Sequence, residues 1–156
     1  MTNELDFSGK RLLITGGSGD IGRAIATAFA QRGARVAFTY FSSHTGMQAT
    51  IDAVEAAGSD ALALRCNLRD KGAIAEIAEP VREHFGEVDI LVSNAATGVL
   101  RPAMELTAKH WDWTMNVNAR AFLDLVTTFG PDMPSGGRIM ALSSAGATKA
   151  IEHYGA

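Results

Sequence analysis

The sequence predicts an α/β fold in which helices cover both faces of a parallel sheet, and three observations support this fold class. Five apolar segments of strand length alternate with longer segments of helical periodicity, which is typical of βαβ units. The strand segments are mostly apolar along their whole length, as expected for strands buried on both faces. A glycine cluster follows the first strand segment and precedes a helical one. Together these features predict a doubly wound, Rossmann-like sheet in a single domain over residues 1–156.

Each expected element occupies a short, well-bounded segment. Strands are expected at residues 11–15, 35–40, 61–65, 88–92 and 138–142. Apolar residues recur at helical spacing in residues 21–32, 46–57, 71–85 and 107–129. Pro80 lies inside the third helical segment and is expected to kink or split that helix. Ligands of such sheets bind beyond the carboxyl ends of the strands, where the strand order reverses between the first and fourth strands.

The loop after the first strand has the spacing of a dinucleotide-binding turn. Gly17, Gly19 and Gly22 form the pattern GxGxxG between a predicted strand and a predicted helix, and this context makes the pattern specific. Glycine permits positive φ and a close approach of the backbone to a pyrophosphate, whose charge is stabilised by free N–H groups and the helix dipole. The alternative is a tight turn that binds no ligand.

The segment after the second strand distinguishes the two nicotinamide cofactors. NAD-type sites place an acidic residue about 20 positions after the glycine loop, where it binds the ribose 2′-hydroxyl. Residues 40–44 contain no acid. Because a carboxylate would repel a 2′-phosphate whereas hydroxyls and a cation accept one, we expect NADP, with Ser42, Ser43 and the nearby Arg23 as candidate contacts. Each serine could instead serve only to cap the following helix.

Composition narrows the range of partners. The 156 residues carry 14 Lys and Arg against 17 Asp and Glu, a formal net charge of -3, so nucleic-acid and membrane-surface binding are not expected. No apolar stretch approaches the ~18 residues of a membrane span. The single cysteine, Cys66, leaves no internal disulfide, and the N-terminal residues lack the order of a signal peptide. We expect a cytoplasmic protein, and the spacing of its four histidines fits no metal site.

Three further motifs accompany the glycine loop. They are Ser93-Asn94-Ala95-Ala96 after the fourth strand, Asn116-Val117-Asn118 in the last helical segment, and Leu142-Ser143-Ser144 followed by Tyr154. With them, the whole chain resembles the short-chain dehydrogenase/reductase family. The strings at residues 94–106 and 110–119 are most similar to the FabL-type enoyl-(acyl-carrier-protein) reductases. Ser144 and Tyr154 are ten positions apart, which resembles the shorter spacing of the enoyl reductase branch, whereas ketoreductases commonly have a longer segment.

The resemblance implies a role for each matching residue. The residues implied at the pyrophosphate and the nicotinamide ribose are Gly16, Ser18, Asp20, Ile21 and Gly22. The residues implied at the adenosine are Asn67 against the adenine and Asn94 with Ala95 against the adenine ribose. In the implied catalytic group, Asn118 supports the active-site water and backbone, Ser144 lies beside the substrate oxygen, and Tyr154 is the acid.

The match departs from the family pattern at two places that bear on activity. Asp20 stands where the family loop has glycine, so the phosphate turn is expected to differ. In the family a helical lysine follows the catalytic tyrosine by four or seven positions and lowers the pKa of its phenol. That lysine is absent because the sequence ends at Ala156. We therefore expect a chain cut after its catalytic tyrosine, with the C-terminal part of the domain missing and little activity of its own.

The expected activity is NADPH-dependent reduction of the double bond of an enoyl thioester, on an acyl-carrier-protein or related acyl substrate, as in fatty acid biosynthesis. A neutral phenol suits this reaction because negative charge develops on the thioester oxygen. Two alternatives stay open: a carbonyl reductase of the same family, acting on a 3-ketoacyl group or another ketone, and a non-catalytic nucleotide-binding fragment or pseudoenzyme. In the resembled family the helix at residues 107–129 also contacts a partner subunit, so a homo-oligomer is expected.

Overall fold

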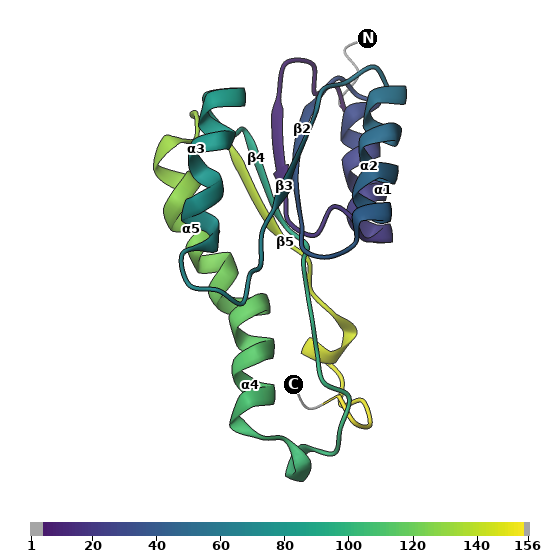
Figure 1. The fold of residues 1–156 in the computed structure, drawn as a ribbon, viewed down its shortest axis with the longest axis vertical. Helices are drawn as coiled ribbons and strands as arrows, with labels where there is room; N and C mark the ends of the chain where they lie inside the picture. Colours follow the sequence, from purple (N-terminus) through teal and green to yellow (C-terminus); the bar gives the residue numbers. More distant parts are fainter. Residues whose placement is uncertain (1–4, 155–156) are drawn as a thin grey trace.

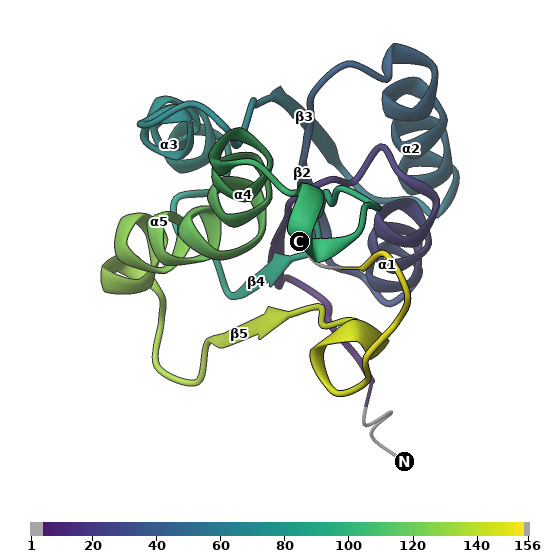
Figure 2. The ribbon, with the colours of Figure 1, turned by 90° about the horizontal axis from the view of Figure 1, so that it is seen from below.

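A computed structural model describes residues 5–154 and contains a five-stranded parallel sheet between two layers of helices (Figures 1 and 2). The strands are β1 (Arg11–Ile14), β2 (Arg35–Tyr40), β3 (Ala61–Arg65), β4 (Ile90–Ser93) and β5 (Arg138–Ala141). The helices are α1 (Asp20–Ala30), α2 (His44–Ala56), α3 (Ala73–Phe85), α4 (Ala108–Met115) and α5 (Ala121–Phe129). The strand order is β3-β2-β1-β4-β5. The predicted doubly wound sheet is confirmed, with its reversal between β1 and β4.

Alternate residues of the inner strands face the two helical layers. Leu12, Ile14 and Phe38 belong to the core on the side of α1 and α2, whereas Leu13 and Leu91 belong to the core on the side of α3 and α5. All five side chains are fully buried. Because successive strand residues point to opposite faces, a sheet covered on both sides needs apolar residues at every position.

The edge strand β5 differs from this pattern. It pairs with β4 in register from Ile90↔Arg138 to Ser93↔Ala141, yet all four of its residues are exposed. In the described part of the chain, the helical layers lie over the strands that precede β5 (Figure 2). The prediction of two-sided burial therefore holds for the inner strands and is wrong for β5.

Pro80 does not split the helix that contains it. α3 runs as one element from Ala73 to Phe85. Proline removes the N–H that would bond the carbonyl of Glu76, but Glu76 is exposed and water can hydrate that carbonyl. On the opposite side, Ile77 and Val81 are buried in the core. Packing of this face holds the helix together across the missing hydrogen bond.

The helix predicted at residues 107–129 begins one residue later and contains an irregular turn. Thr107 caps it, because its hydroxyl oxygen accepts a hydrogen bond from the backbone N–H of His110 at 3.3 Å. Between α4 and α5, residues Asn116–Arg120 form a π-helical turn. Such turns are frequent at functional sites because they change the direction of the side chains around them.

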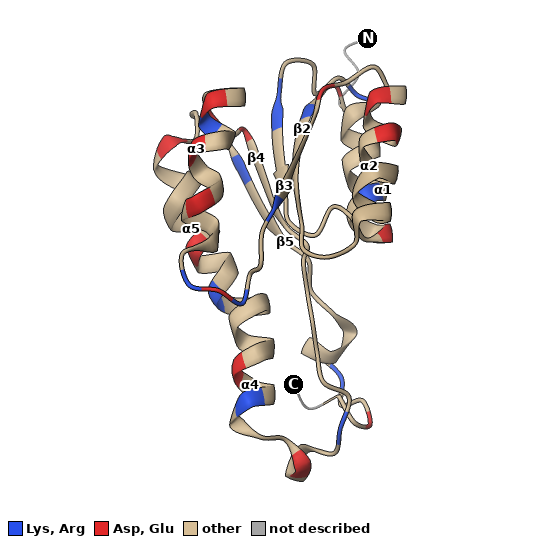
Figure 3. Ribbon diagram, in the orientation of Figure 1, with Lys and Arg blue, Asp and Glu red and all other residues tan. Residues whose placement is uncertain are grey.

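Charges are distributed over the molecule without a basic face among the described residues. Residues of both signs occur in both helical layers (Figure 3). Several form exposed pairs, such as Arg82 with Asp132 at 2.7 Å. No helix within residues 5–154 is both long enough and apolar enough to cross a membrane.

One ionic interaction is buried and joins the starts of β1 and β4. The Asp89 carboxylate accepts hydrogen bonds from the backbone N–H of Arg11 at 3.0 Å and from its Nε at 2.6 Å, and Lys10 Nζ lies 3.4 Å away. The Asp89 side chain is only 7% exposed. Burial opposes ionisation, but the hydrogen bonds from Arg11 and the positive charges of Arg11 and Lys10 together outweigh it, so the pKa of Asp89 lies below its usual value.

We expect Asp89→Ala to lower the free energy of unfolding by about 2–3 kcal/mol, because it leaves the partly buried Arg11 guanidinium without its main partner. The matched control is Asp132→Ala, which removes an exposed pair and should cost less than about 1 kcal/mol. Urea unfolding followed by circular dichroism measures both.

The pH dependence of stability tests the same pair. A carboxylate whose folded pKa is depressed contributes stability above its unfolded pKa, about 3.9 for Asp. This contribution is lost as the pH falls through the lower, folded value. The stability difference between the wild-type chain and Asp89→Ala should therefore be constant near neutral pH and shrink below about pH 4. If Asp89→Ala and Asp132→Ala lowered the free energy of unfolding by the same amount, the role assigned to Asp89 would be contradicted.

Candidate functional site

The loop between β1 and α1 leaves no room for side chains at three of its glycines. Gly16 adopts a φ of +68°, which L-residues with a side chain rarely adopt. A Cβ at Gly17 would lie 2.5 Å from Cβ of Phe38, and a Cβ at Gly22 would overlap the carbonyl oxygen of Gly16. Gly19 is different, because its nearest neighbour would be 3.5 Å away. The fold therefore requires glycine at positions 16, 17 and 22, whereas the GxGxxG pattern consists of Gly17, Gly19 and Gly22.

The loops after β1 and β4 are joined by a reciprocal set of hydrogen bonds. Asn94 Nδ2 donates to the carbonyl oxygens of Thr15 at 2.9 Å and Gly16 at 3.2 Å. The backbone N–H groups of Asn94 and Ala95 donate to Thr15 Oγ1 at 3.0 and 3.1 Å. Asn94 was expected at the adenine ribose, but its amide group is used to hold the glycine loop in place.

A hollow of about 560 Å³ lies between the glycine loop, the start of α2 and the loop after β4. All the cofactor-binding residues expected from the sequence line it except Asn67. Asp20 forms an ion pair with Arg23 at 2.6 Å, although the Asp20 side chain is 95% exposed. The structure thus brings the expected phosphate-site residues together, and it pairs the expected cation, Arg23, with an acid.

Ser42 and Ser43 line this hollow at the end of β2, where no acidic residue follows the strand. Ser43 also caps α2, because its Oγ accepts a hydrogen bond from the backbone N–H of Gly46 at 3.2 Å. Ser43 therefore both caps α2 and lines the hollow. Within residues 5–154, the Ser42 hydroxyl has no hydrogen-bond partner.

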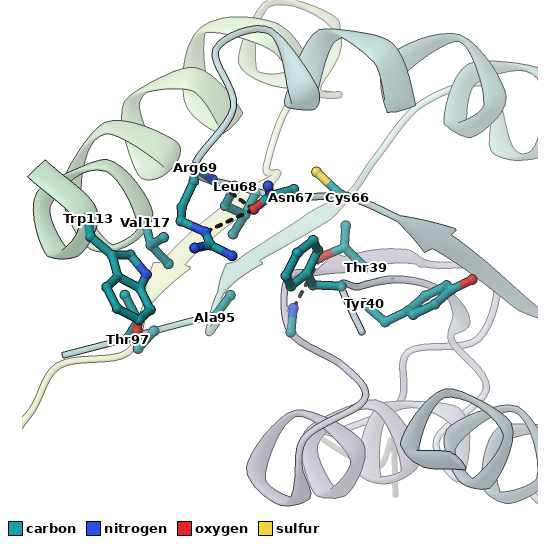
Figure 4. A pocket seen from close by; sticks show the side chains of 13 residues that line it. Thr39, Tyr40, Cys66, Asn67, Leu68, Arg69, Ala95, Thr97, Trp113 and Val117 are labelled. Carbon is teal, nitrogen blue, oxygen red and sulfur yellow. Dashed lines mark hydrogen bonds between the residues drawn. The ribbon is translucent and has the colours of Figure 1, made fainter. Parts of the chain in front are cut away.

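A second hollow of about 320 Å³ adjoins the first and contains Asn67 (Figure 4). The guanidinium carbon of Arg69 lies 5.3 Å from the Phe41 ring centroid and 5.2 Å from that of Trp113. Arg69 thus spans the hollow between the end of β2 and α4. Asn67 Nδ2 donates to Asp70 at 2.8 Å. Arg69, Phe41 and Trp113 were not expected, since they come from three distant segments that share no motif.

Cys66 also borders this second hollow and is chemically inert there. Burial, with a smaller contribution from the charges of Glu76 and Asp70, raises the pKa of its thiol to about 11. The thiol is therefore protonated near neutral pH and is a weak nucleophile there.

The two hydroxyl residues expected at the catalytic centre are brought together. Ser144 Oγ lies 3.0 Å from Tyr154 OH. The short helical turn Ala145–Ala147 follows Ser144, and Tyr154 forms an isolated parallel bridge with Arg101. A Cβ at Gly146 would overlap the ring of Tyr154. Gly146 was not singled out from the sequence, yet the absence of its side chain lets the ring lie beside Ser144.

Asn118 lies in the π-helical turn and holds the loop after β4. Its Oδ1 accepts a hydrogen bond from the backbone N–H of Thr97 at 2.9 Å, and its Nδ2 donates to the Thr97 carbonyl at 2.7 Å. These two bonds satisfy both backbone polar groups of Thr97, as a neighbouring strand would. Asn118 thus holds the backbone of the loop after β4, and its expected role at an active-site water stays a prediction.

Comparison with known proteins identifies the family. A family model described as "Enoyl-(Acyl carrier protein) reductase" matches residues 17–156. Short-chain dehydrogenase/reductase from Serratia marcescens is 33% identical, with a TM-score of 0.90, and the match covers 96% of this chain and 62% of that one. The chain belongs to the short-chain dehydrogenase/reductase family. A short-chain dehydrogenase from Burkholderia cenocepacia, solved in complex with NADP, is 37% identical with a TM-score of 0.89 over 96% of this chain and 62% of its own.

Two of the similar curated proteins have names that state an activity. Hydroxynaphthalene reductase-like protein Arp2 of Metarhizium majus is 34% identical over 141 residues, which are 90% of this chain and 53% of that protein. Versicolorin reductase stcU of Emericella nidulans is 33% identical over 138 residues, 88% of this chain and 52% of its own. The chain spans about half the length of the curated relatives it matches. The family resemblance seen in the motifs is thus confirmed.

The glycine geometry yields a stability test. In Gly22→Ala the new Cβ meets the Gly16 carbonyl and, at 2.8 Å, Asn94 Nδ2. Helix propensity favours alanine by about 1 kcal/mol, but the overlap with fixed backbone should outweigh it and give a net loss of about 2 kcal/mol. Gly19→Ala is the matched control: its Cβ has room, and because Gly19 is the N-cap of α1 the change should cost less than about 1 kcal/mol. Urea unfolding distinguishes them, and a neutral Gly22→Ala would contradict the packing described.

Proposed function

We propose that this chain forms the nucleotide-binding and tyrosine-bearing part of an NADPH-dependent reductase that acts on the double bond of an enoyl thioester. The observation that carries the proposal is the Ser144–Tyr154 hydroxyl pair, whose oxygens lie 3.0 Å apart and whose residues are only ten positions apart in the sequence. This spacing resembles that of the enoyl reductase branch. The pair lies in the C-terminal segment that follows β5, beyond the carboxyl ends of the strands (Figure 1).

The residues at the two hollows fit NADPH, which supplies a hydride when bound. Gly16, Gly19 and Gly22 line the larger hollow without a side chain, so their backbone is open to a close approach by a pyrophosphate. The positive end of α1 points to the same hollow and favours a negative charge there. Ser42 and Ser43 offer hydroxyl groups where an NAD site would have an acid. Solved relatives with bound NADP and NADPH support this choice.

Tyr154 and Ser144 would act on the substrate oxygen. When a hydride reaches the β-carbon of an enoyl thioester, negative charge builds on the thioester oxygen. The Tyr154 hydroxyl can donate a hydrogen bond to that oxygen and so stabilise the charge where it develops. Ser144 Oγ lies 3.0 Å from the Tyr154 hydroxyl, so it can orient the phenol and can donate a second hydrogen bond to the substrate oxygen. Asn118 keeps the neighbouring loop in place through Thr97.

A carbonyl reductase is the second candidate, and the names of the relatives favour it. The Metarhizium and Emericella relatives are named reductases of hydroxynaphthalene and of versicolorin. Delivery of a hydride to a ketone develops negative charge on an oxygen in the same way, and the same phenol would stabilise it. The candidates differ in substrate, so a direct comparison of substrates separates them.

For the enoyl assignment, we expect the whole reductase that contains this chain to oxidise NADPH faster with crotonyl thioesters than with acetoacetyl thioesters. Tyr154→Phe should lower the rate by about 100-fold or more, because it removes the donor at the developing charge. Nucleotide affinity should be unchanged in this variant, which separates loss of chemistry from loss of binding. Turnover of only the keto substrate would favour the carbonyl reductase, and nucleotide binding without turnover would favour a non-catalytic role.

The cofactor assignment has its own test at Ser43. Aspartate is as good a helix cap as serine, so Ser43→Asp should keep the stability of α2 while adding a negative charge to the hollow. NADP⁺ affinity should fall more than about tenfold, because the carboxylate repels the 2′-phosphate, and NAD⁺ affinity should be retained. Ser43→Ala is the control, because it removes the cap without adding charge. Equal affinities for NADP⁺ in the wild-type chain and Ser43→Asp would exclude Ser43 from the 2′-phosphate site.

A further inference from the structure

We propose that Arg65, at the end of β3, is the cation that recognises the 2′-phosphate of NADP and so sets the preference for NADP over NAD. This inference rests on the proposed function, because it assigns a residue to one group of the proposed cofactor. Position 65 lies outside the motifs that carry the family resemblance, and the sequence pointed instead to Arg23 near the glycine loop.

Three adjoining hollows meet at Phe41. Phe41 lines the phosphate hollow with Ser42, the hollow that contains Asn67, and a third hollow of about 320 Å³ that also contains Arg65. A dinucleotide with its pyrophosphate at the glycine loop and its base beside Asn67 must place its adenosine ribose against Phe41. The 2′ position of that ribose then faces either the serines after β2 or Arg65.

Strand pairing brings Arg65 to this place. In the parallel register of β2 and β3, Arg65 lies opposite Tyr40, the last residue of β2. Its Nε is 3.4 Å from the carbonyl oxygen of Phe41, the residue directly before the two serines. The position of Arg65 therefore depends on the sheet, and its guanidinium lies beside the segment where the ribose is expected.

Arg65 is the cation that lines the hollow beside Phe41 and Asn67, and its guanidinium is available to an anion there. Arg23 is paired with Asp20 at 2.6 Å, and the Arg69 guanidinium lies between two aromatic rings. Among residues 5–154, no carboxylate forms an ion pair with Arg65, and its two terminal nitrogens donate no hydrogen bond. A free guanidinium can bind a phosphate with two parallel hydrogen bonds.

The surroundings of Arg65 contain one acid. Asp70 lines the same hollow, but its carboxylate accepts a hydrogen bond from Asn67 Nδ2 at 2.8 Å. On the other side, α2 begins at His44 and directs its positive end toward the serines. A 2′-phosphate would thus meet the guanidinium, the serine hydroxyls and the positive end of α2.

The test is a titration of the wild-type chain, Arg65→Ala and Arg65→Glu with NADP⁺ and NAD⁺, followed by tryptophan fluorescence, since one of the two tryptophans, Trp113, lines the hollow beside Asn67. Loss of a charge-assisted contact should weaken NADP⁺ binding by about 10- to 100-fold in Arg65→Ala. NAD⁺ affinity should change by less than about twofold, because NAD⁺ has no 2′-phosphate. Arg65→Glu should lower NADP⁺ affinity further, and Arg65→Lys, which keeps the charge, should restore part of it.

Two controls decide between competing explanations. Arg32→Ala removes an arginine near the end of α1, where its Nη1 bonds the Ala28 carbonyl at 2.8 Å, and should leave both affinities unchanged. Arg23→Ala tests the alternative cation, and a selective loss of NADP⁺ affinity there but not in Arg65→Ala would overturn the assignment. So would a parallel loss of both nucleotides in Arg65→Ala. A wild-type chain that binds neither nucleotide would overturn the proposed function together with Arg65, whereas failure of Arg65 alone leaves wild-type NADP⁺ binding intact.

Discussion

The loops that follow β1 and β4 are held together through Thr15 and Asn94, and the geometry of the candidate site depends on this junction. Thr15 Oγ1 accepts hydrogen bonds from two backbone N–H groups beyond β4, while Asn94 Nδ2 donates to two carbonyls beyond β1. Thr15 is fully buried. Leaving such a group unpaired away from water costs about 1–3 kcal/mol, so the two loops cannot separate cheaply. The junction therefore fixes the width of the crevice where the strand order reverses.

The same junction explains why the glycines lie where they do. A Cβ at Gly16 would be 2.9 Å from Cα of Ala95, and a Cβ at Gly22 would be 2.8 Å from Asn94 Nδ2. Both conflicts are with the loop after β4, more than 70 residues away in the chain. A glycine pattern is usually explained by the approach of a phosphate. Here contact between the two loops already excludes side chains at these positions, before any ligand binds.

The features that follow from local sequence could be predicted, and those that depend on distant contacts could not. Strand and helix positions follow from apolar periodicity, and the loop next to β1 follows from its glycines. The exposure of β5 could not be predicted, because apolar residues such as Ile139 and Met140 indicate a buried strand whether or not a helix covers it. The π-helical turn at Asn116–Arg120 could not be predicted either, because its residues do not differ in type from those of a regular helix. Nor does sequence show that Arg23 is paired with Asp20 whereas Arg65 is not.

Hydrogen bonding within the chain separates residues that position the site from residues that are available to a ligand. In the sequence, Asn94, Asn118 and Ser144 look alike as polar residues after strands or within a motif. In the structure, the amide groups of Asn94 and Asn118 are bound to backbone groups of the loops, so their contribution is to geometry. Ser144 and Tyr154 instead bond each other with both side chains exposed, and such a pair can exchange its bond for one to a substrate oxygen at little cost. The bonds that position the site are thus those to backbone groups of the loops, and the groups that would do chemistry are those whose hydrogen bonds the chain can give up.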